Sequence, residues 1–192
     1  MSSISKTLRP AIVLFAGLTI LVGVIYPYAM TGIGKVAFAD KADGSLVVKN
    51  GKVVGSYLIG QAFSSPQYFW SRPSATGPMP NNPVNSSGSN FGPTNPAQID
   101  AVKGRIDALK AADPTNTAKI PVDLVTASGS GLDPEISLAA AYYQVPRIAR
   151  ERKLTDAQVR AMIDQLAEHP VMGLFGEARV NVLALNLAMD KK

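Results

Sequence analysis

The sequence predicts an α+β protein in which one N-terminal transmembrane helix is followed by a single soluble domain with a small β-ribbon or sheet and about four helices. Three observations support this fold class. Residues 10–34 contain no charged side chain, an Asn-Gly pair separates two β-rich runs, and helix-start signals recur in the second half of the chain. The chain is therefore divided into a short N-terminal tail (1–10), a transmembrane helix (11–33) and a soluble domain (35–192).

The transmembrane helix is predicted from length and composition. The run from Ala11 to Ile25 is almost wholly aliphatic, and about 20 apolar residues cross a hydrocarbon core of about 30 Å. Ala37-Phe38-Ala39 resembles a signal-peptide cleavage site, but it follows an apolar segment that is too long for a signal peptide. We therefore expect an uncleaved anchor. Basic residues lie on both sides of it, so charge counting does not assign its orientation.

The composition excludes several classes of chemistry. The net charge is only +5 and no basic stripe is interleaved with aromatic residues, so no nucleic-acid partner is expected. The absence of cysteine excludes disulfides and thiolate sites, and a single histidine excludes a histidine-rich metal centre. We predict no metal site. Only carboxylate pairs and serine or lysine chemistry remain as catalytic possibilities.

Residues 45–59 are predicted to form a hairpin around Asn50-Gly51, because both positions of a tight hairpin turn require a positive φ. An aromatic cluster follows at residues 63–70. Residues 72–96 are then rich in proline, glycine, serine and asparagine. Such a stretch fits either a disordered linker or an ordered functional loop, and its local sequence does not separate the two.

Helix signals dominate the rest of the chain. Asn95-Pro96 predicts a helix start and Asp113-Pro114 its end. Asp133-Pro134 predicts the start of a second helix that ends at Pro146. Thr155 and Gln158 form a capping box for a third. The tail at 180–189 fits a strand or a helix, and we favour a short strand that runs into a helix.

The segment at 127–133, the glycine loop, has the most unusual composition. It follows an apolar run, 120–125, which is predicted to be a strand, and it precedes a predicted helix. A strand, a glycine-rich turn and a helix start together can bind an anion. The alternative is a plain tight connection. The loop matches neither a phosphate-binding loop nor a nucleophile elbow. Ser130 with His169 and Asp133 would be the members of a hydrolase triad, although His169 is better explained as a helix-end residue.

Arg147, Arg150, Arg152 and Lys153 form the densest basic cluster. This cluster fits a solvated helix face or a contact with an acidic partner or with lipid headgroups. Gln144, just upstream, is a candidate for either a buried or a partner-facing position.

Short motifs spread over nearly the whole chain resemble those of one family, the C subunits of the bacterial high-affinity Kdp potassium-transporting P-type ATPase. In chain order they are Leu8-Arg9-Pro10-Ala11, Tyr26-Pro27, Gly44-Ser45-Leu46, Leu58-Ile59-Gly60-Gln61-Ala62-Phe63, Tyr68-Phe69-Trp70-Ser71-Arg72-Pro73-Ser74-Ala75, Gly88-Ser89-Asn90, Val125-Thr126-Ala127-Ser128-Gly129-Ser130-Gly131-Leu132-Asp133, Gln144-Val145-Pro146-Arg147-Ile148-Ala149, and Val180-Asn181 with Leu185-Asn186-Leu187-Ala188.

The resemblance implies a non-enzymatic accessory subunit that stabilises a potassium-uptake complex and, as a catalytic chaperone, raises the ATP affinity of the ATPase subunit. The implied partners are a channel-like potassium-translocating subunit, the P-type ATPase subunit, a small single-span subunit and the lipid bilayer. The implied location is the bacterial inner membrane, with a short cytoplasmic N-terminus and a periplasmic C-terminal domain. The resemblance also favours an ordered, partner-facing segment at 72–96.

The resemblance assigns no cofactor to this chain, and ATP enters only through the complex. Gln144 matches a glutamine for which the family description proposes nucleotide contact. A periplasmic domain does not reach cytosolic ATP, so an indirect effect on ATP affinity is the expectation that fits this topology. The candidate partner-interface residues are Arg72, Pro73, Ser74, Asn90, Ser128, Gly129, Ser130, Gly131, Asp133 and Arg147. Those within 72–90 and 127–133 are expected near the potassium entrance of the channel-like subunit.

Two alternatives come from other functional classes. The first is a membrane-tethered envelope hydrolase that uses Ser130, and the second is a solute-binding module.

Overall fold

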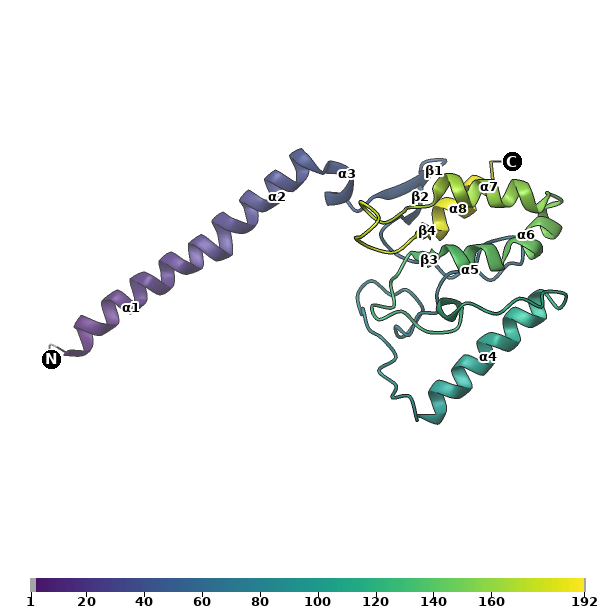
Figure 1. The fold of residues 1–192 in the computed structure, drawn as a ribbon. Coiled ribbons are helices and arrows are strands. Elements are labelled where there is room, and N and C mark those ends of the chain that lie inside the picture. Colours follow the sequence, from purple (N-terminus) through teal and green to yellow (C-terminus); the bar gives the residue numbers. More distant parts are fainter. Residues whose placement is uncertain (1–2, 192) are drawn as a thin grey trace. The chain divides into compact units, whose positions relative to one another are not determined.

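The computed structural model describes residues 3–191 and has two compact units, residues 1–46 and residues 47–192. The first unit is essentially one long helix (Figure 1). It comprises α1 (Ser3–Ile20), a π-helical turn η1 (Leu21–Ile25) and α2 (Tyr26–Ala37). Lys6–Ala37 is long and apolar enough to cross a membrane. The predicted transmembrane range, 11–33, lies inside this helix.

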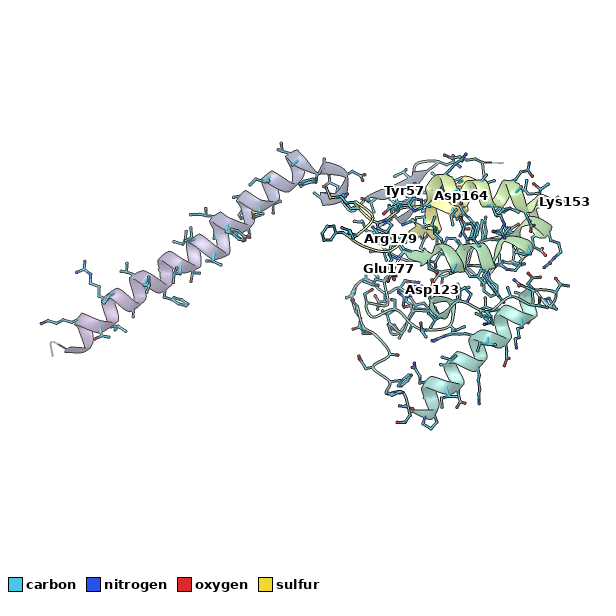
Figure 2. All side chains as sticks on the ribbon, in the orientation of Figure 1. Tyr57, Asp123, Lys153, Asp164, Glu177 and Arg179 are labelled. Atoms are coloured by element: carbon cyan, nitrogen blue, oxygen red, sulfur yellow. The ribbon has the colours of Figure 1, made fainter. Side chains whose placement is uncertain are left out.

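The anchor helix contributes nothing to a protein core. Its large apolar side chains are exposed, and Figure 2 shows them projecting on all sides of the helix. Pro27 lies in the first turn of α2, where a missing backbone N–H is tolerated. A helix that is apolar all round is typical of a membrane span. A single turn, α3 (Ala39–Ala42), follows it and is tied to Ser45 through Asp40.

The predicted hairpin is confirmed as β1 (Leu46–Lys49) and β2 (Lys52–Ser56). Asn50 and Gly51 occupy its turn with φ values of 53° and 75°. This is the positive-φ pair that the Asn-Gly signal predicts.

The segment at 72–96 follows a defined path, which excludes the disordered-linker alternative. Side chains tie it to itself: the Ser74 hydroxyl accepts the Asn81 N–H at 2.9 Å, the Thr76 hydroxyl accepts the Asn82 N–H at 3.0 Å, and the Asn82 amide donates to the Gly77 carbonyl at 2.8 Å. These side-chain bonds give the backbone the hydrogen-bond partners that a helix or a sheet would otherwise supply. The segment then leads into α4 (Pro96–Ala112), whose predicted cap, Asn95, accepts the Ala97 N–H at 3.0 Å.

Two predictions around the glycine loop are wrong. The apolar run at 120–125 forms a 3₁₀ turn, η2 (Val122–Leu124), rather than a strand. The residues after Asp133-Pro134 form a strand, β3 (Glu135–Ser137), paired antiparallel with β4 (Arg179–Asn181) so that Ile136 lies opposite Val180. Asp133 caps a turn here, because its carboxylate accepts the Glu135 N–H. An Asp-Pro pair fits either structure, and the distant partner strand decides between them.

The expected second helix starts later and is split in two. It begins as α5 (Leu138–Tyr143), where the Ser137 hydroxyl accepts the Ala140 N–H at 3.0 Å, and continues after Gln144 as α6 (Val145–Arg152). Pro146 lies in the first turn of α6, so it begins a helix and does not end one.

The two remaining predictions are confirmed. The Thr155–Gln158 capping box starts α7 (Asp156–Leu166). The C-terminal tail is a strand, β4, that runs into α8 (Val182–Met189).

The core of the domain lies where α5–α8 meet the β3–β4 ribbon (Figure 1). Ile148 of α6, Ile163 of α7 and Leu185 of α8 are completely buried there. Phe69 also reaches this core from the segment before residue 72. The fold class, an apolar N-terminal helix followed by an α+β domain, is the predicted one.

Candidate functional site

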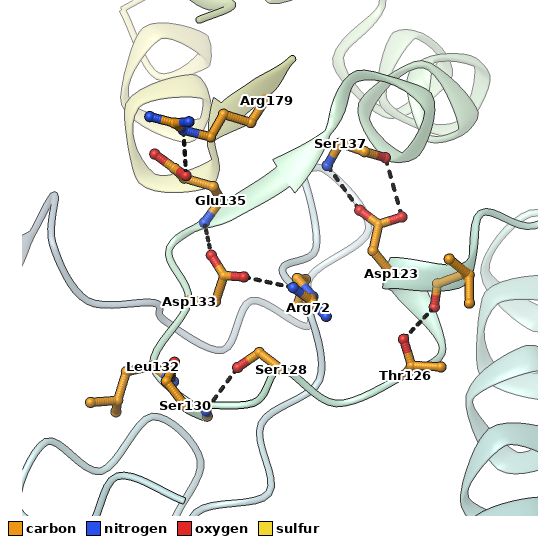
Figure 3. A network of polar contacts seen from close by, with 12 residues as sticks. Arg72, Asp123, Thr126, Ser128, Ser130, Leu132, Asp133, Glu135, Ser137 and Arg179 are labelled. Atoms are coloured by element: carbon orange, nitrogen blue, oxygen red, sulfur yellow. Dashed lines mark hydrogen bonds and ion pairs between the residues drawn. The ribbon is translucent and has the colours of Figure 1, made fainter. Parts of the chain in front are cut away.

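The candidate residues fall into two places in the domain. The first is a polar junction, where residues 72–74 contact the glycine loop. An Arg72 guanidinium nitrogen lies 2.7 Å from an Asp133 carboxylate oxygen, and both side chains are about one quarter exposed (Figure 3). The Ser74 hydroxyl donates to the Gly131 carbonyl at 2.7 Å. Residues that are about 60 positions apart in sequence are therefore joined by direct bonds.

Backbone contacts strengthen the polar junction. The Ser128 N–H donates to the Pro73 carbonyl at 3.1 Å, and the Gly60 N–H donates to the Leu132 carbonyl at 2.8 Å. Gly131 has a φ of 69°, and a Cβ at this position would lie 2.5 Å from the Thr76 methyl carbon. Because both the backbone conformation and the space require it, only glycine fits at residue 131 without rearrangement.

Hydroxyl groups of the glycine loop accept hydrogen bonds from backbone N–H groups of the same loop. The Gly131 N–H donates to the Ser128 hydroxyl at 2.8 Å, and the Leu132 N–H donates to the Ser130 hydroxyl at 3.1 Å (Figure 3). The loop also lies between a 3₁₀ turn and a strand, so the predicted strand–turn–helix cradle for an anion is absent. The tight-connection alternative describes the observed loop.

Part of the polar junction faces outward. Gly129 and Ser130 are exposed, whereas Ser128 is only 3% exposed. The proline-rich segment runs alongside, since the Ser86 hydroxyl donates to the Ser130 carbonyl at 2.9 Å. Asn90, near the end of this segment, is exposed and has a φ of 52°. The loop thus presents small exposed residues on a strongly bonded base.

Charged residues continue from the polar junction along the β3–β4 ribbon. Glu135 lies 2.6 Å from Arg179, and Arg179 lies 2.9 Å from Glu168. The bond from Glu135 raises the pKa of Arg179. The Asp123 carboxylate accepts both the backbone N–H and the hydroxyl of Ser137 (Figure 3). Asp123, Glu135, Ser137 and Arg179, together with Arg72 and Asp133, line a cleft of about 260 Å³ in which the acidic and basic side chains are largely paired with one another.

The second place is a buried node around Gln144, which is 2% exposed. Its side-chain oxygen accepts the Trp70 N–H and an Arg147 N–H, both at 2.7 Å. Its amide nitrogen donates to the Trp70 carbonyl at 3.1 Å and to the Ala140 carbonyl at 3.3 Å. The donors and the acceptor of this side chain are therefore engaged inside the domain.

Arg147 is also buried, at 2% exposure, so the structure does not support the prediction that it lies on a partner-facing surface. It donates to the carbonyls of Pro66 and Tyr68, and its guanidinium lies 4.8 Å from the centre of the Trp70 ring. Desolvation lowers the pKa of Arg147 to about 10. Several acceptors and an aromatic face make up for part of the cost of burying this cation.

Two other members of the basic cluster also bind within the domain. Arg150 pairs with Asp113 at 2.9 Å, and Arg152 pairs with Asp190 at 3.0 Å and donates to the Met189 carbonyl. These arginines join α6 to the end of α4 and to the end of α8. Sequence reasoning missed this role because no local pattern indicates which distant carboxylate or carbonyl an arginine meets.

The hydrolase alternative receives no geometric support in the described residues 3–191. Asp133 is bonded to Arg72 and Ser130 to the Leu132 N–H, and neither has a hydrogen bond with His169 there. No group of three or more histidine, cysteine, aspartate or glutamate side chains in this range is placed to hold a metal ion.

Fold and site together define a membrane-anchored α+β protein whose polar groups are mostly bonded to one another.

Comparison with known proteins identifies its family. Residues 8–191 match the model for "K+-transporting ATPase, c chain". A potassium-transporting ATPase KdpC subunit from Janthinobacterium sp. (strain Marseille) is 71% identical over 187 residues, which cover 97% of this chain and 99% of the relative. The corresponding subunit of Herminiimonas arsenicoxydans is 69% identical, with 97% and 98% covered. That of Dechloromonas aromatica (strain RCB) is 63% identical, with 95% and 96% covered. The chain belongs to the family of K+-transporting ATPase c chains, which are accessory subunits of the potassium-uptake complex.

Proposed function

We propose that this chain is a non-catalytic subunit that stabilises the potassium-transporting ATPase complex and raises the ATP affinity of its ATPase subunit indirectly. The observation that carries the proposal is the family match over residues 8–191. Its proposed partners are the channel-like potassium-translocating subunit, the ATPase subunit and a small single-span subunit.

The bonding of Gln144 supports an indirect effect on ATP affinity. A nucleotide would have to displace bonds to Trp70, Ala140 and Arg147 from a side chain that is 2% exposed. Each such bond left unmade in a buried site opposes ligand binding. Transmission through the other subunits requires no contact with ATP, and such coupling is typically worth about 1–3 kcal/mol, or about 5–150-fold in affinity.

The exposed rim of the glycine loop is the part of the polar junction that we assign to the partner interface. Gly129 and Ser130 offer little side-chain bulk, so a partner backbone is able to approach closely. Their base is held by bonds to residues 72–74, which pre-organises the surface and lowers the entropy cost of association. We place this surface against the channel-like subunit near its potassium entrance, in a periplasmic domain.

The first experiment compares complexes with and without this chain. We expect the complex that lacks it to assemble poorly or to show weaker potassium-stimulated ATP hydrolysis. Ser130→Trp, which places a bulky group on the rim, is expected to weaken assembly, whereas Gln165→Trp on the exposed face of α7 is the matched control. An intact complex with unchanged hydrolysis after deletion of the chain contradicts the proposal.

A second experiment tests sidedness. The chain has no cysteine, so Gln165→Cys, on the exposed face of α7 and away from the rim assigned to the interface, provides a single label site. We expect a membrane-impermeant maleimide to label it in intact cells. Labelling only after lysis assigns the domain to the cytoplasm and restores Gln144 as a candidate nucleotide contact.

A further inference from the structure

The loop between α7 and β4 can be followed in Figure 1. It carries a group of exposed apolar side chains that the polar junction does not explain. We define the apolar tip as residues 171–175. Val171, Met172, Leu174 and Phe175 are 66%, 86%, 81% and 68% exposed. Residues 170–176 contain no acidic or basic side chain. Exposed apolar groups gathered at one place on a domain are typical of an interaction site.

The apolar tip is a closed hairpin. Val171 and Phe175 exchange both backbone hydrogen bonds, at 2.9 and 3.0 Å. The Gly173 N–H donates to the Pro170 carbonyl at 3.0 Å, and the Leu174 N–H donates to the Val171 carbonyl at 3.1 Å. Met172 and Gly173 have φ values of 55° and 71°, which produce the tight reversal.

A tip bonded in this way is suited to an environment poor in water. Backbone groups that enter lipid without a hydrogen-bond partner cost several kcal/mol each. Four N–H groups within residues 171–175 already have partners inside the hairpin. The side chains that project from it are those that partition readily from water into the membrane interface.

Charged residues at the base of the loop set a limit to insertion. Glu168 and Arg179 exchange backbone bonds at 2.8 and 3.0 Å and are also joined by an ion pair. Glu177 and Arg179 lie at this base (Figure 2). Charged groups are costly in hydrocarbon but stable at headgroup level. The loop therefore has an apolar tip and a charged base, and the charged base suits the level of the lipid headgroups.

The length of the chain keeps the domain near a bilayer. The anchor helix ends at Ala37, and the second unit begins at Val47. Even fully extended, residues 38–46 reach about 30 Å. This limit holds whichever side of the membrane the domain occupies.

We propose that the apolar tip inserts into the interfacial region of the bilayer that the anchor crosses. Its size favours lipid over protein as the occupant. A stable protein interface uses roughly 20–30 residues a side, whereas the apolar tip is one narrow hairpin bounded by charged residues. A lipid surface requires only that a few apolar side chains be buried next to an existing anchor.

The test uses the full chain in vesicles of phosphatidylcholine and phosphatidylglycerol. Leu174→Cys carries an environment-sensitive fluorophore, and Val84→Cys, at a position 92% exposed, is the matched control. We expect lipid spin-labelled on its acyl chains to quench most of the emission at 174 and little at 84. Because both sites are exposed, neither substitution is expected to disturb folding.

Two results overturn the proposal. In the first, aqueous iodide quenches the fluorophore at residue 174 as strongly as the fluorophore at residue 84, and spin-labelled lipid does not quench the fluorophore at 174. The second is a site at 174 that, in the assembled ATPase complex, is shielded from both quenchers, because a protein partner then covers the apolar tip. A further variant with Met172→Ser and Phe175→Ser should reduce lipid quenching at 174. These readouts do not depend on ATP hydrolysis, so they separate this proposal from the proposed function.

Discussion

Replacing Gln144 by alanine tests whether this side chain holds the domain together from within. The change leaves the Trp70 N–H and one Arg147 N–H without their acceptor at a site that is 2% exposed. Each buried donor left unpaired costs about 1–3 kcal/mol, and the lost side-chain volume adds to this cost. We expect the free energy of unfolding to fall by about 4 kcal/mol.

The assay is urea denaturation of the full chain in detergent, followed by tryptophan fluorescence. The chain has one tryptophan, Trp70, and it lies at the node itself. With a slope of about 2 kcal/mol per molar urea, the expected loss lowers the midpoint by about 2 M. Gln165→Ala, on the exposed face of α7, is the control and is expected to change stability by less than about 0.5 kcal/mol.

An unchanged midpoint in Gln144→Ala would refute the reasoning. If Gln144 instead binds nucleotide directly, the variant weakens ATP affinity of the complex while the isolated chain keeps its wild-type midpoint. The same variant therefore separates a structural role from a ligand role.

Three further predictions concern the polar junction and α7. Gly131→Ala should lower the free energy of unfolding by more than about 2 kcal/mol, because the positive φ of Gly131 and a neighbouring atom 2.5 Å from the new Cβ both oppose the change. Gly129→Ala is the control, since a Cβ there meets nothing within 4 Å. Equal urea midpoints for the two variants would contradict the argument. Thr155→Ala removes the capping box and should cost about 1 kcal/mol, measured by the same denaturation; a change within error would show that the cap is not needed. Arg72→Ala and Asp133→Ala, combined in a double-mutant cycle, should show a coupling energy of about 1 kcal/mol, and a value near zero would argue against a stabilising ion pair.

Local signals predicted several elements correctly because their physical cause lies within a few residues. The positive φ values of Asn50 and Gly51 follow from the turn chemistry of these two residue types. The reciprocal bonds of Thr155 and Gln158 span a single helical turn. The long apolar helix follows from composition alone.

Predictions failed where a distant segment decides between two local possibilities. Asp133-Pro134 fits a helix start or a turn, and pairing with β4, more than 40 residues later in the chain, selects the turn and the strand β3. Pro146 fits the end of one helix or the first turn of the next, and the buried bonds of Gln144 favour the second. Arg147 fits a solvated helix, but carbonyls near residue 68 bind it inside the domain.

The candidate site shows the same division. The sequence by itself determined the anchor, the hairpin, the caps and the family motifs, because each depends on composition or on residues close together in the chain. Only the tertiary structure decided that Arg72 pairs with Asp133, that Gln144 and Arg147 are buried, and that the apolar tip is exposed. The physical reason is that burial and pairing are set by contacts between segments 60 or more residues apart, such as the 74 residues that separate Trp70 from Gln144. No local pattern encodes which of many polar groups meets another across that distance.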